Sequence, residues 1–188
     1  GQTLLIIGGA GGVGSILIQL ARELTQLQVV ATASRPETRQ WCFDLGAHAV
    51  IDHRQPLAVQ LKSAGFDTVD LVASLTQSQL HFDSIIESLK PQGHLALIDD
   101  PGPLDIMKLK PKSLALHWEF MYTRSMFQTE DMSEQGQLLA EIAALIDAGR
   151  IRSTVNSRFG RINAENLRRA HALLESGKSQ GKIVLAGF

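Results

Sequence analysis

Glycines concentrated in one short segment give the chain its clearest chemical signal. Residues 3–7 form an apolar run typical of a buried strand, residues 8–14 read Gly-Gly-Ala-Gly-Gly-Val-Gly, and residues 15–24 have the periodicity of an amphipathic helix. A strand, a glycine turn and a helix in this order place free backbone N–H groups at a helix start, where the helix dipole favours an anion. The segment therefore predicts a phosphate-binding turn.

The spacing of the glycines narrows the ligand to a dinucleotide. Gly9, Gly11 and Gly14 match the G-x-G-x-x-G pattern in its required setting between strand and helix. We expect Gly9 to permit a tight turn, Gly11 and Gly12 to let a diphosphate approach, and Gly14 to let the helix pack on the strand. The structural alternative is a glycine turn without a ligand. The predicted diphosphate-binding residues are Ala10, Gly11, Gly12, Val13 and Gly14.

The residues after the second predicted strand, 27–33, indicate which dinucleotide. An NAD site has Asp or Glu about 20 residues beyond the glycines to bind the ribose hydroxyls, but this chain has Ser34 and Arg35. A guanidinium suits a 2′-phosphate because it forms charge-assisted, bidentate hydrogen bonds. Arg39, one helical turn later, is a second candidate cation. We therefore predict NADP(H) as the cofactor.

A second interpretation of these three residues stays open. Ser34 to Glu37 reads as a capping box with Pro36 in the first turn, so that Ser34 caps the following helix. Arg35 and Arg39 are then ordinary solvated side chains. Capping and phosphate binding are compatible, so Ser34 can do both.

Three other kinds of site fit the sequence less well than a dinucleotide site does. An S-adenosylmethionine site also prefers an acidic residue after the second strand. The Tyr-x-x-x-Lys pair of short-chain dehydrogenases is missing, since Tyr122 is followed four residues later by Met126. His48, Asp52 and His53 flank a short strand, and their spacing matches no zinc arrangement. We therefore predict no metal site and no catalytic residue within this chain.

The amino-acid composition excludes several classes of protein. The 188 residues are 44% hydrophobic and 20% charged, which is ordinary for one globular domain with a small appendage. A net charge of −1 gives no electrostatic case for nucleic acid or an anionic membrane. No apolar run approaches the ~20 residues of a membrane span. The single cysteine, Cys42, excludes an internal disulfide, and we predict a cytoplasmic protein.

Strands and helices alternate along most of the chain. Beyond the first two strands, further strands are expected at 49–51, 69–73, 94–98 and 113–120, with helices at 56–63, 79–89 and 133–148. Short connections and near-continuous apolar strands favour a parallel sheet covered on both faces. We predict an α/β fold with a doubly wound, six-stranded parallel Rossmann sheet in the order 3-2-1-4-5-6.

The alternation ends near residue 150. We assign residues 1–150 to the dinucleotide-binding domain and residues 151–188 to a C-terminal return segment, with a helix capped by Asn163 and a short strand at 182–185. Gly1 and Gln2 lead directly into the first core strand without an initiator methionine. This start is typical of a piece cut from a longer protein at a domain boundary.

Four motifs in order resemble the cofactor-binding half of the medium-chain dehydrogenase/reductase family, in particular its zinc-type alcohol dehydrogenase-like and quinone oxidoreductase branch. The resemblance spans nearly the whole chain. The segment His117 to Met126 resembles the zinc-type alcohol dehydrogenase-like proteins specifically. The four motifs are Gly9 to Gly14, Leu45 to Ala47 before Val50 to Asp52, Leu89 to Leu95, and Gly181 to Leu185.

The resemblance implies a two-domain enzyme whose catalytic, GroES-like domain is absent from this chain. Substrate contacts, and zinc ligands where zinc is used, come largely from that domain in the family. The segment from about residue 151 normally packs toward it. Family members usually form homodimers through the sixth strand, here 113–120.

Matching positions in the family suggest further cofactor contacts. His53 stands where many relatives carry a tyrosine that reaches the adenosine phosphate. Leu75 and Thr76, after the fourth strand, would lie along the ribose toward the nicotinamide. Asp99, after the fifth strand, and Phe120, after the sixth, would lie near the nicotinamide ring.

Together these observations predict the cofactor domain of an NADPH-dependent oxidoreductase. The intact protein would transfer hydride to a small carbonyl, enone or quinone, with the cofactor supplying the hydride. The isolated chain is expected to bind nucleotide without turnover. The alternative is a non-catalytic NAD(P)-sensing Rossmann module, because fold alone does not separate the two.

Overall fold

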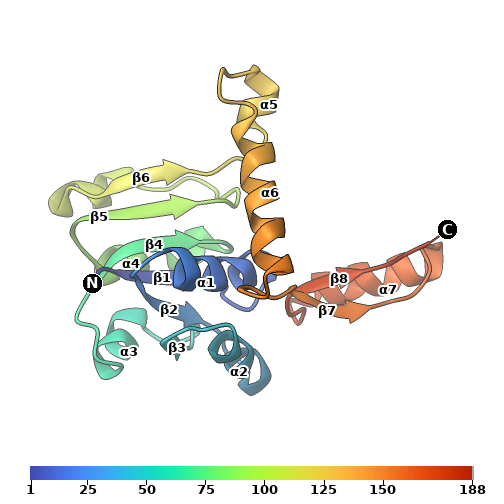
Figure 1. Cartoon of the computed structure of the whole chain (residues 1–188). Helices are drawn as coiled ribbons and strands as arrows, with labels where there is room; N and C mark the ends of the chain where they lie inside the picture. The colour runs from blue at the N-terminus through green and yellow to red at the C-terminus, as the bar shows by residue number, and fades with distance from the viewer. Residues whose placement is uncertain (188) are drawn as a thin grey trace.

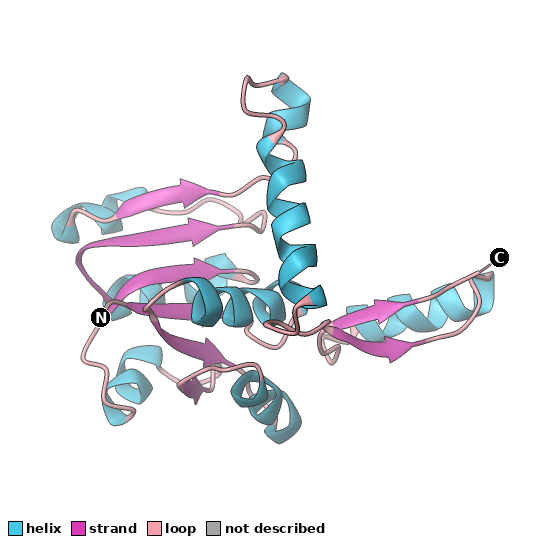
Figure 2. Ribbon diagram, viewed as in Figure 1, coloured by secondary structure: helices cyan, strands magenta, loops and turns pink. Residues whose placement is uncertain are grey.

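A six-stranded parallel sheet forms the body of the protein in this computed structural model, which describes residues 1–187 (Figures 1 and 2). The strand order is β3-β2-β1-β4-β5-β6, and every adjacent pair is parallel. The predicted α/β fold and strand order are therefore confirmed. The strands are β1 (Thr3–Ile7), β2 (Gln28–Thr32), β3 (Ala49–Ile51), β4 (Val69–Ser74), β5 (Leu89–Leu97) and β6 (Ala115–Trp118).

Helices connect successive strands and cover the two faces of the sheet (Figure 2). A long helix after β6 stands across the ends of the strands where the arrows point (Figure 1). The helices are α1 (Gly12–Leu24), α2 (Pro36–Asp44), α3 (Leu57–Ser63), α4 (Ser78–Ser88), the 3₁₀ helix η1 (Ile106–Lys112), α5 (Thr123–Phe127) and α6 (Glu134–Asp147).

Strand β1 shows why the central strands are apolar along their whole length. Alternate residues of a strand point to opposite faces, and both faces of β1 are covered. Leu5 and Ile7 belong to one hydrophobic cluster, and Leu4 and Ile6 belong to the cluster on the other face. A central parallel strand buried on both sides therefore has no polar face.

Strand β5 begins earlier than the sequence predicts. Pro91 to Gly93 was expected to separate the helix from a strand at 94–98, but β5 starts at Leu89 and includes these residues. Leu89 pairs with Val69 and His94 with Leu71, so the extra residues between them are absorbed as an irregularity in the ladder. Neither η1 nor α5 was predicted, and β6 is shorter than the predicted 113–120.

The C-terminal residues form a separate unit that projects beyond the sheet (Figure 1). A two-stranded parallel sheet pairs β7 (Val155–Arg158) with β8 (Lys182–Val184), and α7 (Ala164–Glu175) connects them. The predicted cap is confirmed, because the Asn163 side chain accepts the Asn166 N–H at 2.8 Å. Strand β7 was not predicted, and the functional division at residue 150 stays a prediction.

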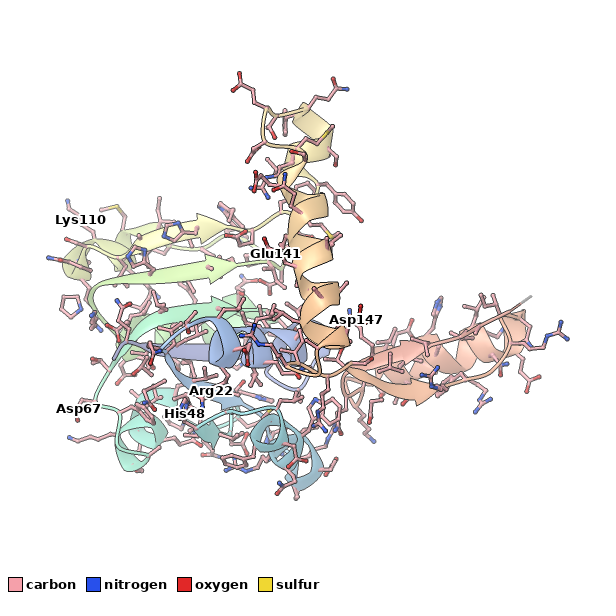
Figure 3. All side chains as sticks on the ribbon, in the orientation of Figure 1. Arg22, His48, Asp67, Lys110, Glu141 and Asp147 are labelled. Carbon is pink, nitrogen blue, oxygen red and sulfur yellow. The ribbon has the colours of Figure 1, made fainter. Side chains whose placement is uncertain are left out.

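Charged side chains of both signs are spread over the sheet body. Arg22 lies on α1, Asp67 between α3 and β4, and Lys110 on η1 (Figure 3). Glu141 and Asp147 lie along α6. In residues 1–187, no helix combines the length and the apolar character needed to cross a membrane.

Candidate functional site

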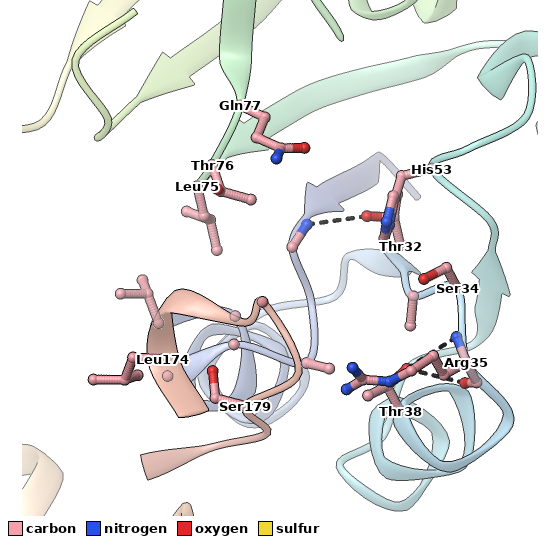
Figure 4. Close-up of a pocket in the computed structure, with 18 residues that line it drawn as sticks. Thr32, Ser34, Arg35, Thr38, His53, Leu75, Thr76, Gln77, Leu174 and Ser179 are labelled. Carbon is pink, nitrogen blue, oxygen red and sulfur yellow. Dashed lines mark hydrogen bonds between the residues drawn. The ribbon is translucent and has the colours of Figure 1, made fainter. Parts of the chain in front are cut away.

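A cavity of about 410 Å³ opens beside the carboxyl ends of β1, β2 and β4 (Figure 4). This is the point where the strand order reverses, the usual ligand position in open α/β sheets. The cavity brings together most residues that the sequence singled out. The predicted residues that line it are Ala10, Gly11, Gly12, Val13, Gly14, Ser34, Arg35, His53, Leu75 and Thr76.

The glycine turn has the close packing expected of it, but the glycine that makes the tight turn is not the predicted one. Gly8, not Gly9, carries the positive φ of the tight turn, at +85°. Gly9 instead lies against β2, since a Cβ there would come within 2.7 Å of the Ala31 Cβ. A Cβ on Gly14 would lie 2.6 Å from the Gly9 carbonyl oxygen. The absence of that Cβ therefore lets α1 pack on the turn, as predicted.

The first turn of α1 offers free hydrogen-bond donors to the cavity. Among residues 1–187, the structure gives no acceptor to the amides of Gly12, Val13 and Gly14. The helix N-cap is Gly11, which has no side chain to fill that role. Three amides and the positive end of a helix dipole fit a diphosphate.

Lys182 is a cation beside the start of α1 that was not among the site residues predicted from the sequence. A Cβ on Gly12 would come within 2.7 Å of the Lys182 Nζ, so the ammonium group lies over the start of α1. The Gly181 N–H donates to the Ala10 carbonyl oxygen at 2.9 Å and fixes this approach. Lys182 belongs to the closing motif, Gly181 to Leu185, which contributed only to the family resemblance. The lysine in that motif was a usable signal for a cation near the predicted phosphate-binding turn.

Arg35 forms the wall of the cavity beside the start of α2 (Figure 4). Its Nη2 donates to the Lys178 carbonyl oxygen at 2.9 Å, and its Nε lies 2.8 Å from the Glu37 Oε1. These contacts hold the guanidinium in place without using all five of its donors. Arg35 thus has both the position and the free donors to bind an anion.

The prediction that Ser34 caps α2 is wrong. The N-cap is Arg35, whose backbone N–H donates to the Thr38 hydroxyl at 3.3 Å, while that hydroxyl donates to the Arg35 carbonyl oxygen at 2.9 Å. Because Pro36 begins the helix, Ser34 is left outside it, at the cavity. Thr38, rather than Glu37, completes the cap at the third helical position.

Three predicted site residues lie outside the cavity lining. Arg39 donates to the Val50 carbonyl oxygen at 2.7 Å and so connects α2 with β3. Asp99 accepts from the Ser78 amide at 2.9 Å and from its hydroxyl at 2.5 Å, which caps the start of α4. Phe120 is 54% exposed and packs edge-on against Tyr122, with ring centroids 5.5 Å apart.

His53 adds a titratable group to the cavity wall. Its ring meets that of His81 edge-on, with centroids 6.0 Å apart. Burial is the main cause that lowers the pKa of both imidazoles below the ordinary histidine value. His53 is therefore a neutral hydrogen-bonding group at neutral pH.

The structure groups no metal-ligand set in residues 1–187. No three or more His, Cys, Asp or Glu side chains converge there in a way that could hold a metal ion. Cys42 lies buried in α2, and burial raises the pKa of its thiol to about 12. Such a thiol is neither a ready nucleophile nor a ready metal ligand.

A family model and curated relatives both connect this chain with zinc-type dehydrogenases. A family model described as zinc-binding dehydrogenase matches residues 45–185. A zinc-type alcohol dehydrogenase-like protein of Staphylococcus aureus is 38% identical over 186 residues, which are 98% of this chain and 55% of that protein. The chain therefore spans about half the length of the curated relatives that it matches.

Solved structures that superpose on this chain include a protein named for the same kind of enzyme. The structure named for a zinc-dependent alcohol dehydrogenase protein from Rhizobium etli superposes with a TM-score of 0.95 at 52% identity, covering 99% of this chain and 54% of that one. The mycobacterial protein Rv1454c, solved in complex with NADPH, superposes with a TM-score of 0.84 at 30% identity, covering 98% and 56%.

Proposed function

This chain belongs to the zinc-binding dehydrogenase family, as the cofactor-binding domain of a medium-chain dehydrogenase/reductase, and we propose that its cavity binds NADP(H). The observation that carries the proposal is the donor set. Unbonded amides at the start of α1 face a diphosphate position, and Arg35 stands where an NAD site has a carboxylate.

Each part of the cavity has a distinct task in this proposal. The amides of Gly12, Val13 and Gly14 bind the diphosphate, with Lys182 adding a positive charge beside it. Ser34, Arg35 and His53 bind the 2′-phosphate of the adenosine. Leu75 and Thr76 line the path from the ribose toward the nicotinamide.

The proposed activity of the intact protein is reduction by NADPH. When bound, the cofactor supplies a hydride, and this domain binds and orients it. A small carbonyl, enone or quinone is the proposed substrate class. Rv1454c, a relative at 30% identity that was solved with NADPH, supports the choice of cofactor. Any zinc would be bound by the catalytic domain that the family resemblance places outside this chain.

A homodimer through β6 is part of the proposal. This strand is the edge of the sheet, so within residues 1–187 one row of its backbone groups has no neighbouring strand. Trp118 on this strand is 60% exposed, and a second copy of the chain would cover it.

Calorimetric titration of the 188-residue chain tests the cofactor proposal. We expect NADPH to bind more tightly than NADH by about tenfold or more, the effect of one or two charge-assisted hydrogen bonds to the phosphate. Equal affinity for the two nucleotides would remove the assignment of Arg35. Absence of binding by both would remove the proposed function.

A further inference from the structure

His53 is the one residue of the cavity lining that can change its charge near neutral pH. Of the described residues that line the cavity, Arg35 and His53 alone carry ionisable side chains. Arginine stays protonated in proteins. Lys182 lies beside the start of α1, but the ordinary pKa of a lysine is far above neutral, so His53 is the candidate for a proton exchanged near neutral pH.

Burial, more than the surrounding charges, keeps the His53 ring neutral before a ligand arrives. Burial lowers its pKa, the Asp52 carboxylate raises it, and the Arg54 guanidinium lowers it. Arg54 holds that carboxylate in an ion pair at 2.7 Å, which weakens its influence on the ring. His81 from α4, whose ring meets that of His53, is buried, and its own pKa is lowered by burial and by His53.

A phosphate dianion at this position would reverse that balance. An opposite charge within a few ångströms favours the protonated imidazole. Two adjacent imidazoles resist a second proton, so the charge is confined to the ring that lines the cavity. His81 contacts His53 and is not itself part of the cavity lining.

We propose that His53 takes up one proton from solvent when the 2′-phosphate of NADP(H) binds, so that recognition of the phosphorylated cofactor depends on pH. This inference rests on the proposed function of the cavity. NADH has no 2′-phosphate and leaves His53 neutral. The preference for NADPH is therefore expected to decrease as the pH rises above neutrality.

Calorimetry in two buffers with different ionisation enthalpies measures the proton directly. At about pH 7.5 the phosphate is already mostly a dianion, so proton uptake reports on the protein. We expect roughly half a proton or more to be taken up with NADPH and none with NADH. Equal uptake with the two nucleotides would overturn the inference.

Two variants assign the proton to a residue. His53→Tyr keeps a hydroxyl donor that does not titrate near neutral pH, so it is expected to lose the proton uptake and to make the preference for NADPH independent of pH in this range. His81→Gln is expected to retain the uptake. Uptake that persists in His53→Tyr would contradict the assignment. NADPH binding without uptake in the unmodified chain would overturn this inference alone, whereas failure to bind NADPH would overturn the proposed function with it.

Discussion

Protein contacts hold the Arg35 guanidinium in place and still leave some of its N–H donors free for an anion. Its contacts with the Lys178 carbonyl oxygen and with Glu37 restrict the guanidinium to one place. A phosphate there gains a preorganised cation, because less side-chain entropy is lost on binding. The neighbouring Glu37 carboxylate competes for the same donors, so the expected preference for NADPH is moderate.

Replacing Arg35 tests this assignment at the scale of one side chain. We expect Arg35→Ala to lower NADPH affinity by about tenfold or more, for loss of a charged hydrogen bond, and to leave NADH affinity within about twofold. Calorimetric titration measures both. Arg124→Ala on α5 is the charge-matched control, since its partner Asp131 lies outside the cavity lining. If Arg35→Ala retained the full preference, another residue would bind the phosphate.

Cys42 gives a second prediction at this scale. Burial raises the pKa of its thiol to about 12, so very little thiolate is present at neutral pH. We expect the folded chain to react with a thiol reagent only when it unfolds. The measurement is the rate of labelling with and without denaturant. Fast labelling of the folded chain at pH 7 would show that Cys42 is accessible.

The turn between β1 and α1 sets the geometry of the site at the scale of elements. Gly14 brings the start of α1 onto the turn, where a side chain would meet the carbonyl oxygens of Gly8 and Gly9. Because these are backbone atoms of a tight turn, they cannot move aside as a flexible side chain could. The packing of α1 and the aim of its amides therefore depend on the same missing Cβ.

Gly14→Ala is expected to destabilise the fold and weaken nucleotide binding together. Overpacking of this kind typically costs about 1–3 kcal/mol in the free energy of unfolding, which denaturant titration measures. Gly136→Ala in α6 is the matched control. Nothing lies within 4 Å of a Cβ there, so an unchanged or slightly raised stability is expected. Equal effects of the two substitutions would contradict the close packing at Gly14.

Asp70 joins three strands through one carboxylate. It accepts the Thr3 N–H of β1 at 2.7 Å and pairs with Lys90 of β5. Burial opposes ionisation of Asp70, but the hydrogen bonds from Lys90 and Thr3 outweigh it and lower its pKa. A lowered pKa in the folded state stabilises the fold above the unfolded pKa, and this contribution is lost as the pH falls through the folded value.

Asp70→Asn is therefore expected to lower the melting temperature at neutral pH. The difference from the unmodified chain should shrink below about pH 4, where the carboxylate becomes protonated. Thermal unfolding measured across this range tests the prediction. A difference independent of pH would show that the ionisation of Asp70 is not the source of its contribution.

The sequence predicted some elements well and others poorly, for physical reasons. The hydrophobic pattern located β1 and β3 to the residue. β1 is a central strand and is apolar on both faces, whereas β3 is a short apolar run at the edge of the sheet. Pro91 and Gly93 suggested a break before β5, whereas the ladder absorbs them as an irregularity. The cap of α2 depends on whether Ser34 or Thr38 reaches the backbone, and local pattern does not distinguish them.

Most of the candidate site was also predictable, since its residues follow the strands in sequence. The contribution of the C-terminal unit was not, because it depends on contacts between residues far apart in the chain. Lys182 lies near Gly12 in a segment that the hydrogen bond from Gly181 to Ala10 attaches to the glycine turn. Strand β7, which pairs with β8, has a mixed composition that gives no clear alternating pattern.

At the scale of the whole molecule, the C-terminal unit and the sheet body meet at the cavity. Leu174, Gly177 and Ser179 of the C-terminal unit line the cavity opposite the residues that follow β2 (Figure 4). The Arg35 bond to Lys178 joins the two sides. A bound nucleotide would therefore contact both the sheet body and the projecting unit.

A crystal structure of this chain with NADPH tests the central claim most directly. We expect the diphosphate to lie within hydrogen-bond distance of the amides of Gly12, Val13 and Gly14. The 2′-phosphate should lie against Arg35 and next to His53. A nucleotide bound elsewhere, or a 2′-phosphate that points into solvent away from Arg35, would contradict it.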